Sequence, residues 1–230
     1  MVELNSVKVD SKNSFFDSMA AIKGGQKLSY YIRFIMIGDS GTGKTTLLLR
    51  YIHEDTEGEF RLSDKPVHTV DSKSKMIFRQ GKNIRVEIQD TAGMERYRSL
   101  TKSHYNNAMG ALLVFDLTDE GSFQNLPNWH DDLRRYADSD IQTILVGTRC
   151  HRKEHRTVSE ESVRRYAEHI EVPYIEVSGE RNINVDKCFD MLIDRIFEKQ
   201  PDVVKEEVSL NHQDEDKDTY TRLCAPCCSS

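Results

Sequence analysis

Short apolar runs alternate with longer, helically periodic segments between residues 30 and 200. The apolar runs are Ile32–Ile37, Ala111–Phe115, Thr143–Val146 and Tyr174–Val177. Each has the length of a strand, and a largely apolar strand is typical of a sheet that is covered on both faces. We therefore predict four buried strands in this part of the chain.

Two more strands are expected as a hairpin that starts near Ser74. In its second half, Ile84, Val86 and Ile88 alternate with polar residues, which is typical of a strand with one wetter face. Gln80–Asn83, just before that strand, has the composition of a turn. The hairpin would bring the sheet to six strands.

Apolar residues recur every three or four positions in the segments between these strands. The periodic segments are Phe123–Tyr136, Val163–Ile170 and Val185–Phe197, and this spacing gives a helix one apolar face. Strands that alternate with helices indicate an α/β fold, in which a mainly parallel sheet carries helices on both faces. Cys188 lies within the last apolar stripe, so we expect it in the core.

The periodicity stops at both ends of the chain, which divides it into three parts. Residues 1–29 are polar and aperiodic, and we interpret them as a mobile N-terminal extension. Residues 30–200 form the folded domain, and residues 201–230 form an acidic tail with seven acidic residues against three basic ones. The tail thus carries −4 of the net charge of −6. This acidic balance argues against nucleic acid as a partner.

The first predicted strand leads directly into a glycine-rich loop. Gly38–Thr45 reads GDSGTGKT and fits the pattern G-x-x-x-x-G-K-[ST], in which backbone N–H groups cradle phosphate oxygens at the start of a helix. Lys44 would neutralise the terminal phosphates, and the hydroxyl of Thr45 would ligate Mg²⁺. The strand before and the helix after the loop disfavour a plain surface turn. The expected phosphate-binding residues of the loop are Asp39, Ser40, Gly41, Thr42, Gly43, Lys44, Thr45 and Thr46.

A second motif ends the predicted hairpin. Asp90–Gly93 reads DTAG, and an acidic residue at a neighbouring strand end can hold the Mg²⁺ through water. The N–H of Gly93 can meet a γ-phosphate, so we expect Gly93 to serve both phosphate binding and catalysis, together with Lys44. This arrangement makes the following segment sensitive to the γ-phosphate.

Several segments together resemble the Rab family of small GTPases in the Ras superfamily. They are GDSGTGKT (38–45), DTAGMERYRSL (90–100), GALLVFDLTDEGSFQNLPNW (110–129), VGTRCH (146–151), EVSG (176–179) and CCSS (227–230). The resemblance implies a P-loop NTPase with the small-GTPase fold, a six-stranded mainly parallel sheet and five helices. It also implies a switch in vesicle traffic that binds GTP and GDP with Mg²⁺ and hydrolyses GTP. The partners implied are an exchange factor, a GTPase-activating protein (GAP), effectors, and Rab escort and GDI-type proteins.

The chain departs from this family at the base-binding motif N-K-x-D, which falls on residues 148–151. The family's aspartate accepts two hydrogen bonds from guanine, whereas His151 in its place has at most one acceptor nitrogen. Losing two charged hydrogen bonds predicts roughly 10²- to 10⁴-fold weaker binding. The family's lysine after EVSG is Glu180. The expected base-binding residues are Thr148, Arg149, His151, Ser178 and Gly179.

The two switch segments depart from the family as well. The family's catalytic glutamine is Met94 here, and a thioether cannot orient the attacking water, so we expect slow hydrolysis at this degenerate catalytic position. The position of the family's Mg²⁺-ligating threonine is Val67 in this chain. Thr69 could serve as the Mg²⁺ ligand only if the alignment with the family shifted by two residues. The family's three effector-facing aromatic positions are Ser72, Gln89 and Tyr105 here. The alternative for Tyr105 is ordinary packing beneath the second switch.

The terminal CCSS resembles the Rab signal for double geranylgeranylation on Cys227 and Cys228. Two lipid chains give stable membrane residence where one gives marginal binding. The resemblance places the protein on the cytoplasmic face of an intracellular membrane or the plasma membrane, with a cytosolic pool. The alternatives are a C-a-a-X signal, an unmodified tail, and a zinc site with Cys224, which lacks an evident fourth ligand.

The leading hypothesis is therefore a Rab-like, GTP-responsive membrane switch. The second is a pseudo-GTPase, a lipid-anchored binding module with little turnover, which the residues at positions 67, 94 and 151 favour. The third is a P-loop enzyme that uses ATP, such as a kinase, which the DTAG and CCSS motifs disfavour.

Overall fold

The computed structural model describes residues 30–53, 72–79, 82–91 and 102–199. The expected extension of residues 1–29 and the acidic tail of residues 201–230 lie outside these ranges. All strands, helices and contacts given below lie within the four described ranges.

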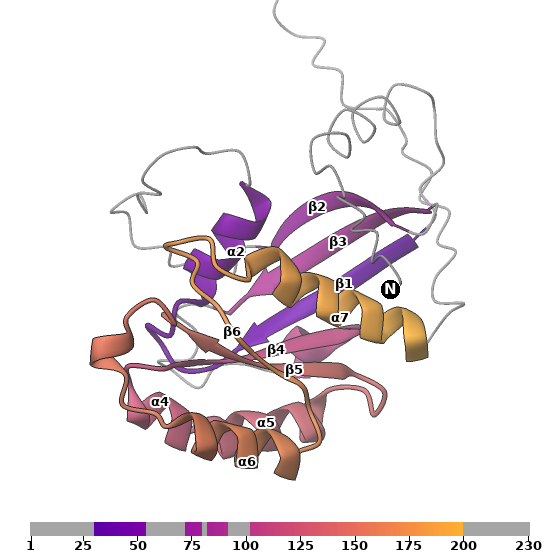
Figure 1. The fold of residues 1–230 in the computed structure, drawn as a ribbon. Coiled ribbons are helices and arrows are strands. Elements are labelled where there is room, and N and C mark those ends of the chain that lie inside the picture. The colour runs from indigo at the N-terminus through magenta and orange to yellow at the C-terminus, as the bar shows by residue number, and fades with distance from the viewer. Residues whose placement is uncertain (1–29, 54–71, 80–81, 92–101, 200–230) are drawn as a thin grey trace, which may run out of the picture.

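A six-stranded sheet forms the centre of the domain (Figure 1). Its strand order is β2-β3-β1-β4-β5-β6. β2 and β3 pair antiparallel as the predicted hairpin, and the other neighbours pair parallel, which confirms the predicted six-stranded, mainly parallel sheet. The strands are β1 (Tyr30–Ile37), β2 (Ser72–Arg79), β3 (Lys82–Asp90), β4 (Gly110–Asp116), β5 (Gln142–Thr148) and β6 (Tyr174–Glu176).

Helices occupy the three periodic segments, and two more lie outside them, one of which follows the glycine-rich loop. The helices are α2 (Lys44–Ile52), α3 (Lys102–Tyr105), α4 (Glu120–Gln124), α5 (Leu126–Tyr136), α6 (Glu160–His169) and α7 (Val185–Lys199), with a 3₁₀ turn at Lys153–His155. The periodic stretch from Phe123 to Tyr136 is shared by two helices that meet at Asn125. Pro127 in the first turn of α5 has no N–H to continue the ladder of α4, which accounts for the break.

Helices cover both faces of the sheet (Figure 1). α2 and α7 pack on one face, where their apolar residues form a core with strands β1, β3, β4 and β5. α5 and α6 pack on the opposite face over a second core. Cys188 lies fully buried in the first core, as its place in the apolar stripe predicted. The fold is therefore a three-layer α/β structure of the predicted class.

The carboxyl ends of the parallel strands meet at one edge of the sheet. The loops that follow β1, β3, β4 and β5 all leave from this edge, which is where open α/β sheets bind their ligands. The opposite edge of the sheet carries the amino ends of the same strands. Among the described helices, none combines the length and apolar character that crossing a membrane requires.

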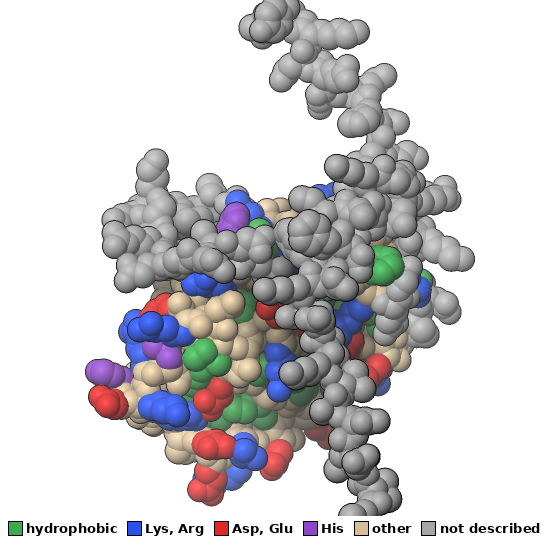
Figure 2. All heavy atoms as spheres, turned by 45° about the horizontal axis from the view of Figure 1, so that its top comes forward, with side chains coloured by type: hydrophobic (Ala, Val, Ile, Leu, Met, Phe, Trp, Pro, Cys, Tyr) green, Lys and Arg blue, Asp and Glu red, His purple; other side chains and the backbone are tan. Residues whose placement is uncertain are grey.

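Acidic and basic side chains are interspersed on the face that Figure 2 shows. Among the described residues there, blue and red groups alternate and do not gather into a region of one sign. Such a surface lacks the single-sign field that steers highly charged ligands from a distance.

Candidate functional site

The loop between β1 and α2 has a backbone that only glycine permits at its first position. Gly38 has φ of 143°, and a Cβ placed there would lie 2.0 Å from the carbonyl oxygen of Val114 on the adjacent strand β4. Gly41 and Gly43 also have positive φ values, of 80° and 90°. The glycine spacing of the motif therefore follows from close strand approach and from left-handed backbone.

Lys44 is held inside this loop. Its side chain is 2% exposed, and its ammonium donates to the carbonyls of Gly38 at 2.9 Å and Asp39 at 2.7 Å. These contacts hold the ammonium against the backbone turn of the loop. The hydroxyl of Thr42 donates to the Asp39 carbonyl at 2.9 Å and tightens the same turn. Lys44 thus lies where it can neutralise a terminal phosphate.

Thr45 and Asp90, which are both expected to serve the Mg²⁺ ion, lie in contact with each other. The hydroxyl of Thr45, in the first turn of α2, donates at 2.5 Å to the carboxylate of Asp90, the last residue of β3. Asp90 is only 3% exposed. Thr91 donates to the Met36 carbonyl at 2.7 Å, which fixes the end of β3 against β1. Carboxylate and hydroxyl oxygens are the ligands that Mg²⁺ prefers, so the donor set fits this ion.

The side chain of Asp39 is bound on the outer side of the loop. Asn125 donates to one carboxylate oxygen of Asp39 at 2.6 Å, and the indole of Trp129 donates to the other at 2.8 Å. The carbonyl of Asp39 is also engaged, by Lys44 and Thr42, so a phosphate could contact this residue only through its N–H. The side-chain contacts tie the phosphate loop to the junction of α4 and α5, and no sequence pattern signals them because the partners are 86 and 90 residues away.

The end of β5 is anchored to the phosphate loop by two residues. The hydroxyl of Thr148 lies 2.6 Å from the Thr42 carbonyl, and Arg149 donates to the Gly41 carbonyl at 2.8 Å. Arg149 has a positive φ of 59° and pairs with the buried carboxylate of Asp116. Burial lowers the pKa of Arg149, and the nearby Arg152 adds to the effect. Both residues of the altered motif therefore still hold the loop in place.

His151 joins the β5 loop to the loop after β6. Its Nδ1 lies 2.8 Å from the Ser178 hydroxyl, and its Nε2 lies 3.1 Å from the carboxylate of Glu180. Arg152 donates to both oxygens of that carboxylate, at 3.0 and 3.1 Å. The backbone N–H of Arg181 donates to the Ser178 hydroxyl at 3.1 Å. His151 thus lies in contact with both Ser178 and Glu180, and the sequence marked Glu180 only as the replacement of a lysine.

The loop after β6 also rests on α2. A Cβ on Gly179 would lie 3.1 Å from the backbone of Thr46, so the two chain segments touch closely. Arg50 of α2 donates to the Gly179 carbonyl at 2.9 Å and to the Glu180 carbonyl at 3.3 Å. The phosphate loop, the β5 loop and the β6 loop therefore form one continuous rim.

Most of the predicted site residues are brought together at this rim. Tyr105, in contrast, is fully buried in the second core and lies 5.7 Å from Tyr136 between ring centroids, as expected for a packing residue. Ser72 is exposed, and Gln89 accepts from Arg33 at 2.5 Å. The predicted site residues outside the described ranges are Thr69, Gly93, Met94, Cys227 and Cys228.

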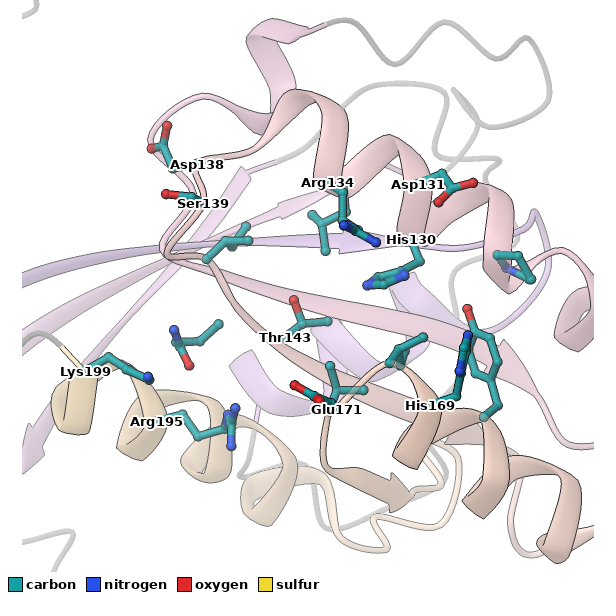
Figure 3. Close-up of a pocket in the computed structure, with 17 residues that line it drawn as sticks. His130, Asp131, Arg134, Asp138, Ser139, Thr143, His169, Glu171, Arg195 and Lys199 are labelled. Atoms are coloured by element: carbon teal, nitrogen blue, oxygen red, sulfur yellow. The ribbon is translucent and has the colours of Figure 1, made fainter.

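A separate groove of about 1010 Å³ lies between α5, α6 and α7 (Figure 3). Its lining includes the first residues of β5, so it lies at the edge of the sheet opposite the phosphate loop. Three basic and three acidic residues line it with two histidines: Arg134, Arg195, Lys199, Asp131, Asp138, Glu171, His130 and His169. This balanced lining does not single out a ligand of either charge.

A family model and several known proteins match most of the chain. A model of the Ras family matches residues 33–198. The chain is 39% identical to the Ras-related protein Rab-3A of Homo sapiens over 176 residues, which cover 76% of this chain and 77% of that protein. It is 38% identical to the Ras-related protein SEC4 of Candida albicans, over 77% of this chain and 83% of that protein. It is 37% identical to the GTP-binding protein ypt2 of Schizosaccharomyces pombe, over 77% of this chain and 86% of that protein.

Proposed function

We propose a nucleotide-binding mode for this chain, which belongs to the Ras family and is a Rab-like small GTPase of vesicle traffic. Membership implies binding of GTP and GDP and GTPase activity in general, and it does not favour the pseudo-GTPase alternative. The observation that carries the proposed binding mode is the 2.5 Å contact between Thr45 and Asp90, beside the buried ammonium of Lys44. Thr45 and Asp90 thus provide oxygen ligands for Mg²⁺, and Lys44, next to Thr45 in the chain, provides a positive charge for phosphate.

The phosphates are bound mainly by backbone groups and by Lys44. The N–H groups from Ser40 to Thr46 and the N-terminus of α2 supply partial positive charge, and Lys44 supplies a full one. Thr45 would ligate Mg²⁺ directly and Asp90 through water, with Thr69 as a further candidate ligand. An Mg²⁺ ion held by these residues would supply positive charge to offset that of the phosphates. Gly93 would sense the γ-phosphate through its N–H.

Intrinsic hydrolysis is slow in this proposal because of Met94. Positioning of the attacking water requires a group that can accept and donate hydrogen bonds, and a thioether is only a weak acceptor. A GAP would then supply the missing group in trans. The regulators and effectors of Rab proteins are the partner classes that family membership suggests.

Single-turnover hydrolysis with Mg²⁺ and GTP tests the role of Met94. Met94→Gln should raise the rate by about 10-fold or more, since one general catalytic contact is worth about 10²–10⁴-fold at its best. Met94→Leu is the matched control, because it keeps the apolar character and should leave the rate unchanged. If the glutamine variant binds GTP normally and hydrolyses it no faster, residue 94 does not limit turnover.

Membrane residence would rest on Cys227 and Cys228. The acidic tail provides no basic second signal for an anionic leaflet, so both lipid chains are needed for stable anchoring. Replacing both cysteines with serine should make the protein soluble, and either single change should release part of it. Cell fractionation of the three variants measures this, with Cys224→Ser as the control. Unchanged membrane association of the double variant would assign the anchor to another part of the chain or to a partner protein.

A further inference from the structure

The loops after β5 and β6, here called the base side, carry an acidic residue at a different position from the one in the family pattern. That pattern places a carboxylate at position 151 and a lysine at position 180, whereas this chain has His151 and Glu180. The structure brings these two side chains together, with Nε2 of His151 3.1 Å from the carboxylate of Glu180. The carboxylate is therefore still present on the base side, carried by the other loop.

The carboxylate of Glu180 indicates the tautomer of His151. A carboxylate only accepts hydrogen bonds, so a hydrogen on Nε2, 3.1 Å from it, is favoured. In the neutral ring Nδ1 is then the acceptor for the hydroxyl of Ser178 at 2.8 Å, and the N–H of Arg181 donates to the same hydroxyl oxygen. Both ring nitrogens are thus engaged within the protein. His151 itself has no acceptor left for a base.

Glu180 retains the capacity that His151 lacks. A carboxylate has about four lone-pair positions, and two donor nitrogens, from His151 and Arg152, contact this one. Its side chain is 41% exposed, against 17% for His151, so it is open to a ligand. Its backbone is fixed, because Arg50 donates to its carbonyl.

Two other carboxylates that end neighbouring strands, Asp116 and Glu176, are already engaged, and Glu154 on the β5 loop is exposed with no contact to the described base-side residues. Asp116 is 4% exposed, pairs with Arg149 and accepts from the N–H and hydroxyl of Thr118. Glu176 is bound by Arg156 at 2.8 Å and by the hydroxyl of Tyr174 at 2.7 Å. Among the described residues of the base-side loops, Glu180 is thus the carboxylate best placed to accept from a ligand.

We propose that Glu180 is the specificity-determining carboxylate that reads the guanine base, with His151 as its positioning residue. Guanine presents two adjacent donors, N1–H and the 2-amino group, which match the two oxygens of a carboxylate. Adenine presents an unprotonated N1 at the same place, which a carboxylate repels. Xanthine presents a carbonyl where guanine has the amino group, so a carboxylate repels it as well. The inference rests on the proposed nucleotide site and names the group that selects the base there.

Equilibrium binding of GTP, XTP and ATP with Mg²⁺ to the full-length protein tests the assignment. Glu180→Gln should weaken GTP binding and strengthen XTP binding, because an amide accepts from N1–H and donates to the xanthine carbonyl. We expect the preference for GTP over XTP to fall about 10- to 100-fold. Glu180→Ala should weaken GTP binding and strengthen XTP binding less than the amide does, because it removes the repulsion without adding a donor. The matched control is Glu160→Gln, an exposed carboxylate on α6 that pairs with Arg164.

A charge exchange provides the second test. His151→Asp alone places two carboxylates side by side, and Glu180→Lys alone removes the reading group, so each single variant should bind GTP more weakly. The double variant restores an acid–base pair in the opposite order and should recover GTP binding. The preference for GTP over XTP should recover together with GTP affinity, whereas a purely structural ion pair would restore the affinity for all nucleotides equally.

The outcomes separate this inference from the proposed function. If the unmodified protein binds none of the three nucleotides, the nucleotide site itself is wrong. If it binds GTP selectively and Glu180→Gln leaves the GTP to XTP ratio unchanged, the site stands and the assignment of Glu180 is overturned. An equal loss of all three nucleotides in Glu180→Gln would also overturn it, by showing a structural role.

Discussion

The phosphate side and the base side of the site are built in different ways. On the phosphate side, the motif Gly38–Thr45 is intact, and the contacts of Lys44 and Thr45 run within the loop or to the end of the adjacent strand β3. On the base side, the defining residues of the motif at 148–151 differ from the family pattern, yet two of them still anchor the phosphate loop. Residues 148 and 149 can therefore hold the phosphate loop in place without also determining which base is bound.

The reason lies in the groups that do the binding. Phosphates are bound by backbone N–H groups, which every residue except proline has, so the requirement falls on backbone shape and on glycine. A base is read by side-chain donors and acceptors, and a carboxylate can be supplied from either of two facing loops. Side chains on the base side can therefore be exchanged between loops, whereas the glycines of the phosphate loop cannot be replaced without changing its backbone.

The strongest test of this difference is Gly38→Ala. The added Cβ would lie 2.0 Å from the Val114 carbonyl oxygen in a backbone with φ of 143°, so strand separation or loop distortion must follow. We expect a loss of about 3 kcal/mol or more in the free energy of unfolding. Urea denaturation measures it. Gly41→Ala is the control, because its added Cβ would meet no atom within 4 Å and only backbone strain of about 1–2 kcal/mol applies.

A smaller and uniform effect is expected from Thr148→Val. The change keeps the shape of the side chain and removes the hydroxyl that holds the Thr42 carbonyl, which leaves a buried acceptor without its partner. Release of GTP and ATP should accelerate by the same factor, about 10-fold, since the lost contact is worth about 1–2 kcal/mol. Stopped-flow release of fluorescent nucleotides measures both rates. Thr143→Val, at the other end of β5, should leave them unchanged, and a change confined to GTP would mean that Thr148 reads the base.

The smallest and most selective effect is expected from Ser178→Ala. It removes the donor to Nδ1 of His151 and so frees the ring to turn away from Glu180. The preference for GTP over XTP should fall about 3- to 10-fold, which is the range of one neutral hydrogen bond, with phosphate affinity unchanged. Ser178→Thr should restore the preference, because it keeps the hydroxyl. An unaltered preference in the alanine variant would remove His151 from the recognition of the base.

The sequence by itself determined the layers of the fold and the phosphate loop. The alternation of apolar runs with helical periodicity predicted the six strands and the helices on both faces, because burial imposes its period on each element separately. Lys44 and Thr45 belong to a contiguous motif whose geometry is local. Their roles could therefore be inferred from the motif alone.

The tertiary structure alone decided the contacts between the loops. Ser178 lies 27 residues from His151, and Trp129 lies 90 residues from Asp39, so no local pattern indicates these partners. The loops that carry them meet because the parallel strands end at one edge of the sheet. In the sequence, His151 and Glu180 are two separate departures from a motif, and packing of the loops makes them a pair.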